Sequence, residues 1–176
     1  MTYFLLLALL FLAIAGTQLR WTYHRKRLLD HGWETVLQRA EQIDFEAVRT
    51  VAECYLQPNC NQLRVETDAM WQMVGGLEGL ERLRSNAAAI LDLAIYAQQW
   101  NDVEGAAVAA MIRRDAARLK GAVLKVELAS LVGIDFVQGP LHVQEAAAAY
   151  YLMRSRLVGL YQNSHVALLP RLEAVL

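Results

Sequence analysis

The stretch that decides the fold is VEGAAVAAMIRRDAARLKGAVLKVELASLV, which spans residues 103–132. It contains no proline and is rich in alanine, the residue with the highest helix propensity. Asp102 precedes it as a candidate N-cap, and Glu104 lies in the first turn, where the helix dipole favours an acid. The stretch therefore predicts one helix of about eight turns, long enough to run the length of a small domain.

Two apolar stripes run along this predicted helix when its residues are placed at 100° intervals. The first stripe consists of Val108, Ile112, Ala116, Leu119, Val123 and Val126. The second stripe consists of Ala106, Ala110, Ala117, Gly121, Leu124 and Leu128. Charged residues separate the two stripes, with Arg113, Lys120 and Glu127 on one side and Arg114, Arg118 and Lys125 on the other. A helix with two apolar faces is expected to be covered on both.

Two arrangements would cover both stripes. The helix is either the central helix of a bundle, or it turns one stripe to the core and the other to a partner. We favour the central position, because a bundle already needs a central helix. The second stripe also contains Ala117-x-x-x-Gly121, two small residues one turn apart that permit another helix to approach closely.

Helical patterns also fill the remainder of residues 33–176, with apolar residues recurring at three- and four-residue spacing. The pattern that begins at Trp33 predicts one helix running to about Leu56, although Asp44 could instead begin a second helix as its N-cap. The helix that begins at Thr67 or Asp68, its candidate N-caps, is expected to kink or break at Gly75-Gly76 and Gly79. Pro140 suits the first turn of the last long helix. We predict an all-α domain, an antiparallel bundle of four to five helices.

Two details of the C-terminal part are left open by the pattern. Arg154 falls in the apolar stripe of the last long helix, where it either pairs with a buried acid or extends its guanidinium to the edge of the core, and we favour the second. The tail after Pro170 either docks on the domain or is a loose end.

Residues 1–32 have a different character, that of a membrane anchor with a basic juxtamembrane segment. The run from Tyr3 to Leu19 carries no charged side chain, and 17 residues of helix span about 26 Å, just enough for the hydrocarbon core of a bilayer. The residues expected at the membrane interface are Tyr3, Arg20, Trp21, Tyr23, Arg25, Lys26 and Arg27. We predict a single-pass transmembrane helix that contacts lipid through residues 3–27.

The cations also predict the orientation of this anchor. By the positive-inside rule, the N-terminus lies outside the inner (cytoplasmic) membrane and the domain over 33–176 lies in the cytoplasm. A cleaved signal peptide is the main rival, supported by Ala13-Ile14-Ala15, but it lacks a cationic n-region; a buried core helix is a further alternative. In the cytoplasm, Cys54 and Cys60 are expected to remain thiols.

Two His-x-x-Glu pairs, His31 with Glu34 and His142 with Glu145, are the candidates for a metal site. An i,i+3 spacing on a helix places both side chains on one face, although di-iron bundles use the reverse order, Glu-x-x-His. Both pairs lie at expected helix starts, where capping and the helix dipole favour a Glu and tolerate a His. We therefore expect no metal or other cofactor, and keep a metal-dependent bundle enzyme as the alternative function.

Other motifs for chemistry are missing from the sequence. It has no Gly-x-Ser-x-Gly elbow and no Gly-Lys-Ser/Thr phosphate loop. Its formal net charge of −1, without a long run of one sign outside residues 20–27, offers no footprint for nucleic acid. We expect a membrane-anchored, non-enzymatic interaction or assembly protein, a homo-oligomer or a small subunit of a larger membrane complex, with the second stripe as its candidate partner surface.

Overall fold

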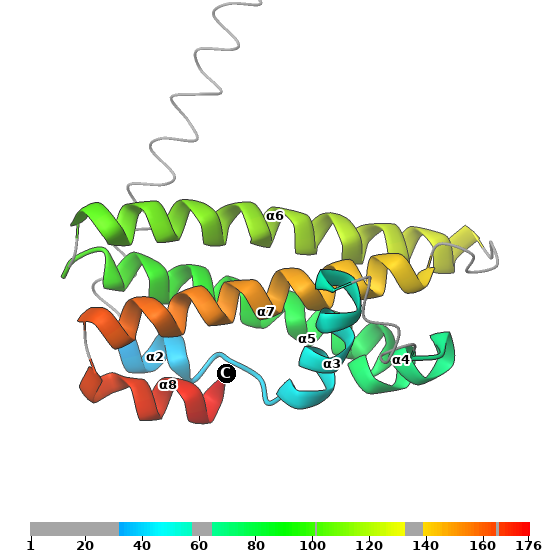
Figure 1. Cartoon of the computed structure of the whole chain (residues 1–176), viewed down its shortest axis with the longest axis horizontal. Coiled ribbons are helices and arrows are strands. Elements are labelled where there is room, and N and C mark those ends of the chain that lie inside the picture. The colour runs from blue at the N-terminus through cyan, green and yellow to red at the C-terminus, as the bar shows by residue number, and fades with distance from the viewer. Residues whose placement is uncertain (1–31, 58–64, 101, 133–138, 165) are drawn as a thin grey trace, which may run out of the picture.

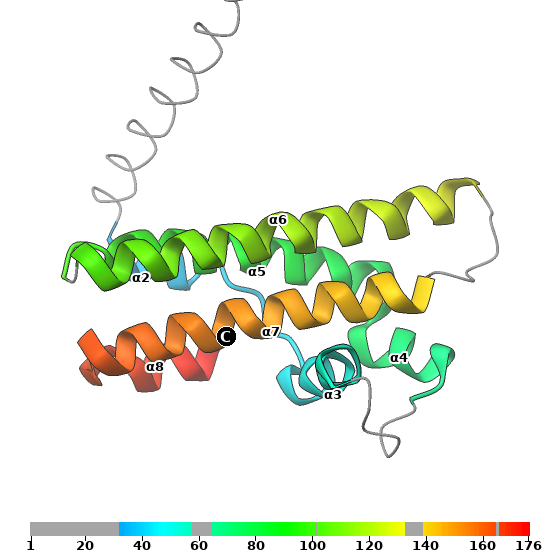
Figure 2. The same cartoon turned by 45° about the horizontal axis from the view of Figure 1, so that its top comes forward.

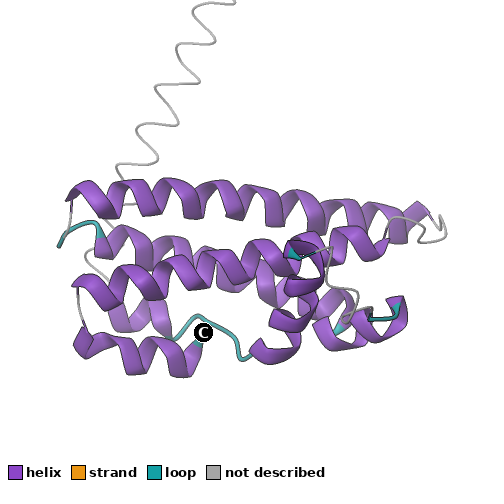
Figure 3. Cartoon of the chain, in the orientation of Figure 1, coloured by secondary structure: helices purple, strands orange, loops and turns teal. Residues whose placement is uncertain are grey.

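The computed structural model describes residues 32–57, 65–100, 102–132, 139–164 and 166–176 (Figure 1). Within these ranges the chain is all-α, without a strand, which confirms the predicted fold class (Figure 3). The elements are α2 (Trp33–Leu37), α3 (Phe45–Leu56), α4 (Thr67–Val74), α5 (Gly76–Ala97), α6 (Asp102–Val132), α7 (Gly139–Ser164), the short 3-10 helix η1 (Val166–Leu168) and α8 (Leu169–Val175).

The number of helices exceeds the four or five predicted, because seven α-helices lie in the described ranges alone. Two differences account for this. The pattern over 33–56 is divided into α2 and α3, and Asp44 caps α3 by accepting a hydrogen bond from the backbone N–H of Ala47 at 3.0 Å. The C-terminal tail also docks as α8, where Leu172 is fully buried and Leu176 is 4% exposed.

The predicted membrane anchor lies outside the described residues, as do its flanking aromatic and cationic side chains. Among the helices that are described, none combines the length and the apolar character needed to cross a bilayer. The predicted anchor over residues 3–27 is therefore left as a prediction from the sequence.

The three long helices form an antiparallel series in which α5, α6 and α7 alternate in direction (Figure 1). Helix α7 is central, since it packs against α3, α4, α5, α6 and α8. Helix α6 packs against α5 and α7 from one side, while α3, α4 and α8 lie on the other side of α7 (Figure 2). The bundle therefore has α6 as an outer layer, and this contradicts the central position favoured for it from the sequence.

Two glycines produce the sharp junction between α4 and α5. Gly75 has a left-handed backbone, with φ of 84°, and caps α4, a conformation that costs glycine little. Gly79 lies against the end of α4, where an added Cβ would stand 1.7 Å from the carbonyl oxygen of Val74. Of the two outcomes predicted for these glycines, a kink or a break, the structure has the break, and the close approach explains the glycine at position 79.

A buried side chain connects the α2–α3 segment to α5. Asn86 is fully buried; its amide oxygen accepts from the backbone N–H of Glu41 and its amide nitrogen donates to the carbonyl of Glu41, both at 2.7 Å. Because both polar groups of one residue's backbone are satisfied by one side chain, this pair of bonds holds the irregular segment against the bundle.

Arg154 and Arg156 lie two residues apart on α7 and face different neighbours. The guanidinium of Arg154 lies over the ring of Phe45 on α3, 3.7 Å from its centroid, so the partner of Arg154 is an aromatic ring. Arg156 instead forms an ion pair with Asp115 of α6, whose carboxylate is almost fully buried. This charged contact between α6 and α7 was not predicted from the sequence.

Candidate functional site

The two apolar stripes of α6 have opposite surroundings. In the first stripe Ile112, Leu119 and Val126 are fully buried, Ala116 and Val123 are nearly so, and Val108 packs against the core at its edge. The contacts of α6 are with α5 and α7, so this stripe faces these two helices. The prediction that the first stripe belongs to the core is consistent with this packing.

The second stripe faces solvent. Leu124 is 52% exposed and Leu128 51% exposed, Ala106, Ala110 and Ala117 are exposed, and Gly121 is half-buried. Leu131, which continues the stripe one heptad after Leu124, is 82% exposed. We name the exposed surface formed by these residues the outer face of α6; it consists of Ala106, Ala110, Ala117, Gly121, Leu124, Leu128 and Leu131.

The outer face overturns the expectation that both stripes are covered within the bundle. The central position belongs to α7, in which Ala146, Ala147, Ala148 and Ala149 are consecutive and all buried. Four successive alanines occupy every direction around a helix, so neighbours approach α7 closely on all sides. Since α7 already fills the centre, α6 has neighbours on one side only among the described elements.

Cations border the outer face on both sides. Arg114 and Arg118 lie on one edge and Lys120 on the other; all three are exposed and make no ion pair with the described part of the chain. Arg113 and Lys125 extend the two edges, and Lys125 forms an ion pair with Glu145 of α7, with 3.9 Å between Nζ and Oε2. The long edges of the face therefore carry positive charge.

The acids of α6 do not neutralise these edges. Asp115 points into the bundle and pairs with Arg156. Glu127 pairs with Arg84 of α5, with 3.4 Å between Oε1 and Nη1. Glu104, near the start of the helix, accepts a hydrogen bond from Asn163 at 3.2 Å. Each of these three carboxylates is turned towards α5 or α7, so none of them pairs with Arg114, Arg118 or Lys120.

The described members of the two His-x-x-Glu pairs, Glu34, His142 and Glu145, do not come together in one metal site. Glu34 accepts a hydrogen bond from Arg171 of α8 at 2.8 Å, and its neighbour Trp33 donates to the hydroxyl of Tyr161 at 2.9 Å, near the end of α7. His142 and Glu145 contact each other at 3.5 Å at the start of α7. Nineteen residues of helix separate His142 from Tyr161, about 28 Å. Glu34 and the second pair are too far apart to bind one ion.

Metal coordination has no support elsewhere in the described ranges, where no three His, Cys, Asp or Glu side chains gather closely enough to hold an ion. His31 and Cys60 lie outside these residues. Cys54 is half-buried in α3, and its thiol donates to the carbonyl of Thr50 at 3.4 Å, as expected for a small helical residue rather than a ligand.

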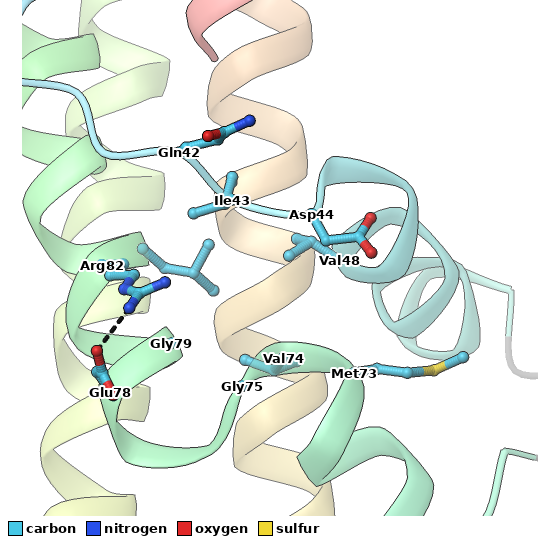
Figure 4. Close-up of a pocket in the computed structure, with 11 residues that line it drawn as sticks. Gln42, Ile43, Asp44, Val48, Met73, Val74, Gly75, Glu78, Gly79 and Arg82 are labelled. Atoms are coloured by element: carbon cyan, nitrogen blue, oxygen red, sulfur yellow. Dashed lines mark hydrogen bonds and ion pairs between the residues drawn. The ribbon is translucent and has the colours of Figure 1, made fainter.

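A second surface feature is a pocket of about 340 Å³ between the start of α3 and the α4–α5 junction (Figure 4). Its apolar wall contains Ile43, Val48 and Leu83. Its charged groups are already engaged: Glu78 and Arg82 pair at 2.5 Å, and Asp44 caps α3. The pocket thus offers no unengaged charged group to define a ligand, and the outer face of α6 is the stronger candidate.

Comparison with protein-family models, with curated proteins and with solved structures gave no match to this chain.

Proposed function

We propose that this protein is a membrane-anchored, non-enzymatic interaction or assembly protein that presents the outer face of α6 to a protein partner. The observation that supports the proposal is the exposure of an apolar stripe on the longest described helix, interrupted by Arg113 and Arg114 between Ala110 and Ala117. Exposed apolar residues that cluster on one face are typical of an interaction site. The partner is either another copy of the chain or a subunit of a larger complex.

The membrane location in this proposal rests on the sequence. Tyr3–Leu19 is the proposed transmembrane helix, and the cations from Arg20 to Arg27 place residues 33–176 in the cytoplasm. A protease-accessibility assay on intact cells tests the topology with a tag at Leu176. We expect the tag to be protected, and digestion from outside the cell would contradict the orientation.

The alternative function, a metal-dependent bundle enzyme, is not proposed. It requires the two His-x-x-Glu pairs to share one site, and Glu34 lies at the opposite end of α7 from His142 and Glu145.

The interaction proposal is tested by introducing a charge into the outer face. Leu124→Glu places a carboxylate in the apolar stripe, and Leu141→Glu is the matched control, because Leu141 is 53% exposed and lies on α7. The full-length variants are extracted from their native membrane in mild detergent, and the size of each assembly is measured by light scattering after gel filtration.

We expect the unaltered protein and Leu141→Glu to elute as an assembly larger than the monomer, and Leu124→Glu to elute as the monomer. Both variants change an exposed leucine to glutamate, so a general effect on folding would appear in both. An assembly of unchanged size and composition in Leu124→Glu would contradict the proposal, as would a monomeric unaltered protein.

A further inference from the structure

We propose that the occupant of the outer face of α6 is an amphipathic helix of a different protein, whose apolar seam is bordered by acidic residues on both sides. This inference rests on the proposed function and specifies the chemistry of the partner. It follows from the sizes of the side chains in the outer face and from the charges at its edges.

The side chains along most of the outer face are small. Ala106, Ala110, Ala117 and Gly121 occupy the first five turns, and the leucines at 124, 128 and 131 follow at the C-terminal end. Small residues one turn apart let the backbone of a second helix approach closely. Membrane-surface helices instead use Leu, Phe and Trp on the apolar face, because lipid affinity increases with buried apolar area.

Gly121 is the residue that most favours a helical occupant. It lies in the interior of a 31-residue helix, where glycine is less favourable than alanine because of its backbone entropy. A Cβ added at Gly121 would meet no atom within 4 Å. The described fold therefore does not need a glycine there, whereas a helix that packs closely on the outer face would.

The charges at the edges disfavour a second copy of α6 as the occupant. If two outer faces packed together, in parallel or antiparallel, the edge with Arg114 and Arg118 and the edge with Lys120 would each meet cations of the other copy. Facing like charges oppose association, whereas carboxylates on the partner would pair with these exposed cations. Charge complementarity therefore indicates acidic residues on both edges of the partner helix.

The length of the outer face sets the size of the partner segment. From Ala106 to Leu131 the helix rises about 38 Å, which is matched by about seven turns of a partner helix. The partner is thus expected to supply one continuous helix of roughly 25 residues. Its side chain opposite Gly121 can be small or large, because the glycine itself leaves room for close approach.

The test is site-specific photo-crosslinking of the full-length chain in living cells. A photoreactive amino acid replaces Leu124 in the outer face or, as a control, Leu56, which is exposed on α3 on the other side of α7. The crosslinked peptides are identified by mass spectrometry. We expect position 124, but not 56, to capture a helical segment of another protein with Asp or Glu on both edges of its apolar seam.

Three charge variants then test the role of the edges. Arg114→Glu, Arg118→Glu and Lys120→Glu together reverse the charges of three cations without ion pairs in the described chain, and should lower the crosslink yield at least about tenfold. Arg114→Lys, Arg118→Lys and Lys120→Arg keep the charges and should retain the yield. Replacement of the same three residues by Gln removes their charges without introducing opposite ones and should give an intermediate crosslink yield. Thermal melting of each variant shows whether a lower yield comes from loss of folding.

Gly121→Leu distinguishes a helix from a lipid surface by the sign of its effect. A leucine at this position blocks close approach of a helix and should reduce the yield, whereas it would increase affinity for vesicles containing anionic phosphatidylglycerol. Tighter binding of Gly121→Leu to such vesicles, with the crosslink yield unchanged, would overturn the inference in favour of a membrane surface.

The remaining outcomes separate this inference from the proposed function. A protein crosslink that persists at full yield in the charge-reversed variant overturns the acidic helix but leaves the interaction function standing. A crosslinked peptide from the chain itself also overturns the acidic helix of a different protein, and it indicates self-association through the outer face of α6. If position 124 captures no protein in the unaltered chain, both the inference and the proposed function fail.

Discussion

Arg156→Met should destabilise the bundle strongly, because it leaves a buried carboxylate without its counter-ion. Asp115 lies on the inner side of α6, is 2% exposed, and pairs with Arg156 of α7. Removing one partner of a buried pair costs about 3 to 5 kcal/mol. The side chain of Arg156 is itself 30% exposed, so water reaches the vacated position and we expect the lower end, about 3 kcal/mol.

The assay is urea unfolding of the full-length chain in mild non-ionic detergent, followed by far-ultraviolet circular dichroism. The double variant Asp115→Leu, Arg156→Met is the essential control, since apolar replacement of both partners is often neutral or stabilising. We expect the double variant to recover most of the free energy of unfolding lost in Arg156→Met. A loss below about 1 kcal/mol in the single variant, or no recovery in the double variant, would refute the reasoning.

Three further predictions concern other parts of the bundle. Asn86→Ala leaves the backbone N–H and carbonyl of Glu41 without partners and should cost about 2 kcal/mol in urea unfolding, with faster hydrogen exchange at residues 38–44; unchanged exchange there would count against it. Gly79→Ala should cost at least about 2 kcal/mol because its Cβ would collide with the Val74 carbonyl, whereas Gly159→Ala, with nothing within 4 Å, should be neutral or stabilise by up to about 1 kcal/mol; equal effects at the two positions would contradict the close approach at Gly79. The Tyr150 hydroxyl is buried beside Asn86, and this burial raises the pKa of Tyr150 to about 12. A raised phenol pKa contributes stability that is present below about pH 10 and is lost as the pH rises towards 12. Tyr150→Phe should therefore be nearly neutral at pH 7 and should remove about 2 to 3 kcal/mol of the alkaline destabilisation. A stability profile of Tyr150→Phe from pH 8 to 12 identical to that of the unaltered protein would refute this prediction.

Local signals in the sequence predicted most of the helices, because these signals act within a few residues. Asp44 caps α3, Gly75 ends α4, and Pro140 lies in the first turn of α7. The predicted number of helices was too low partly because the irregular backbone of residues 38–44, which separates α2 from α3, is held by Asn86, 45 residues away from Glu41. A contact of that sequence separation leaves no periodic signal in either segment.

The buried ion pair illustrates the same limit within one helix. Arg154 and Arg156 differ by two positions, so they project about 200° apart around α7. One lies over Phe45 of α3 and the other pairs with Asp115 of α6. The apolar periodicity singled out Arg154 alone, yet the partner of each arginine depends on which helix packs on which side of α7.

The candidate site was predicted in its composition but not in its exposure. The sequence identified the residues of the second stripe and the cations at its edges. It also contains a signal for Leu131, because the positions 117, 124 and 131 are each seven residues apart. The preference for burial of this stripe was wrong, because a wheel shows which residues share a face and does not show how many neighbours the helix has.

The sequence by itself determined that the chain is helical, where several of its helices begin or end, and that residues 103–132 carry two apolar faces between rows of charge. These properties depend on backbone propensity and on a period of 3.6 residues, which are local. Only the tertiary structure decided that α7 takes the centre and α6 the outside, since that choice depends on which helices approach each other most closely. The four consecutive buried alanines of α7 permit this approach on every side, and the outer face of α6 is consequently left exposed.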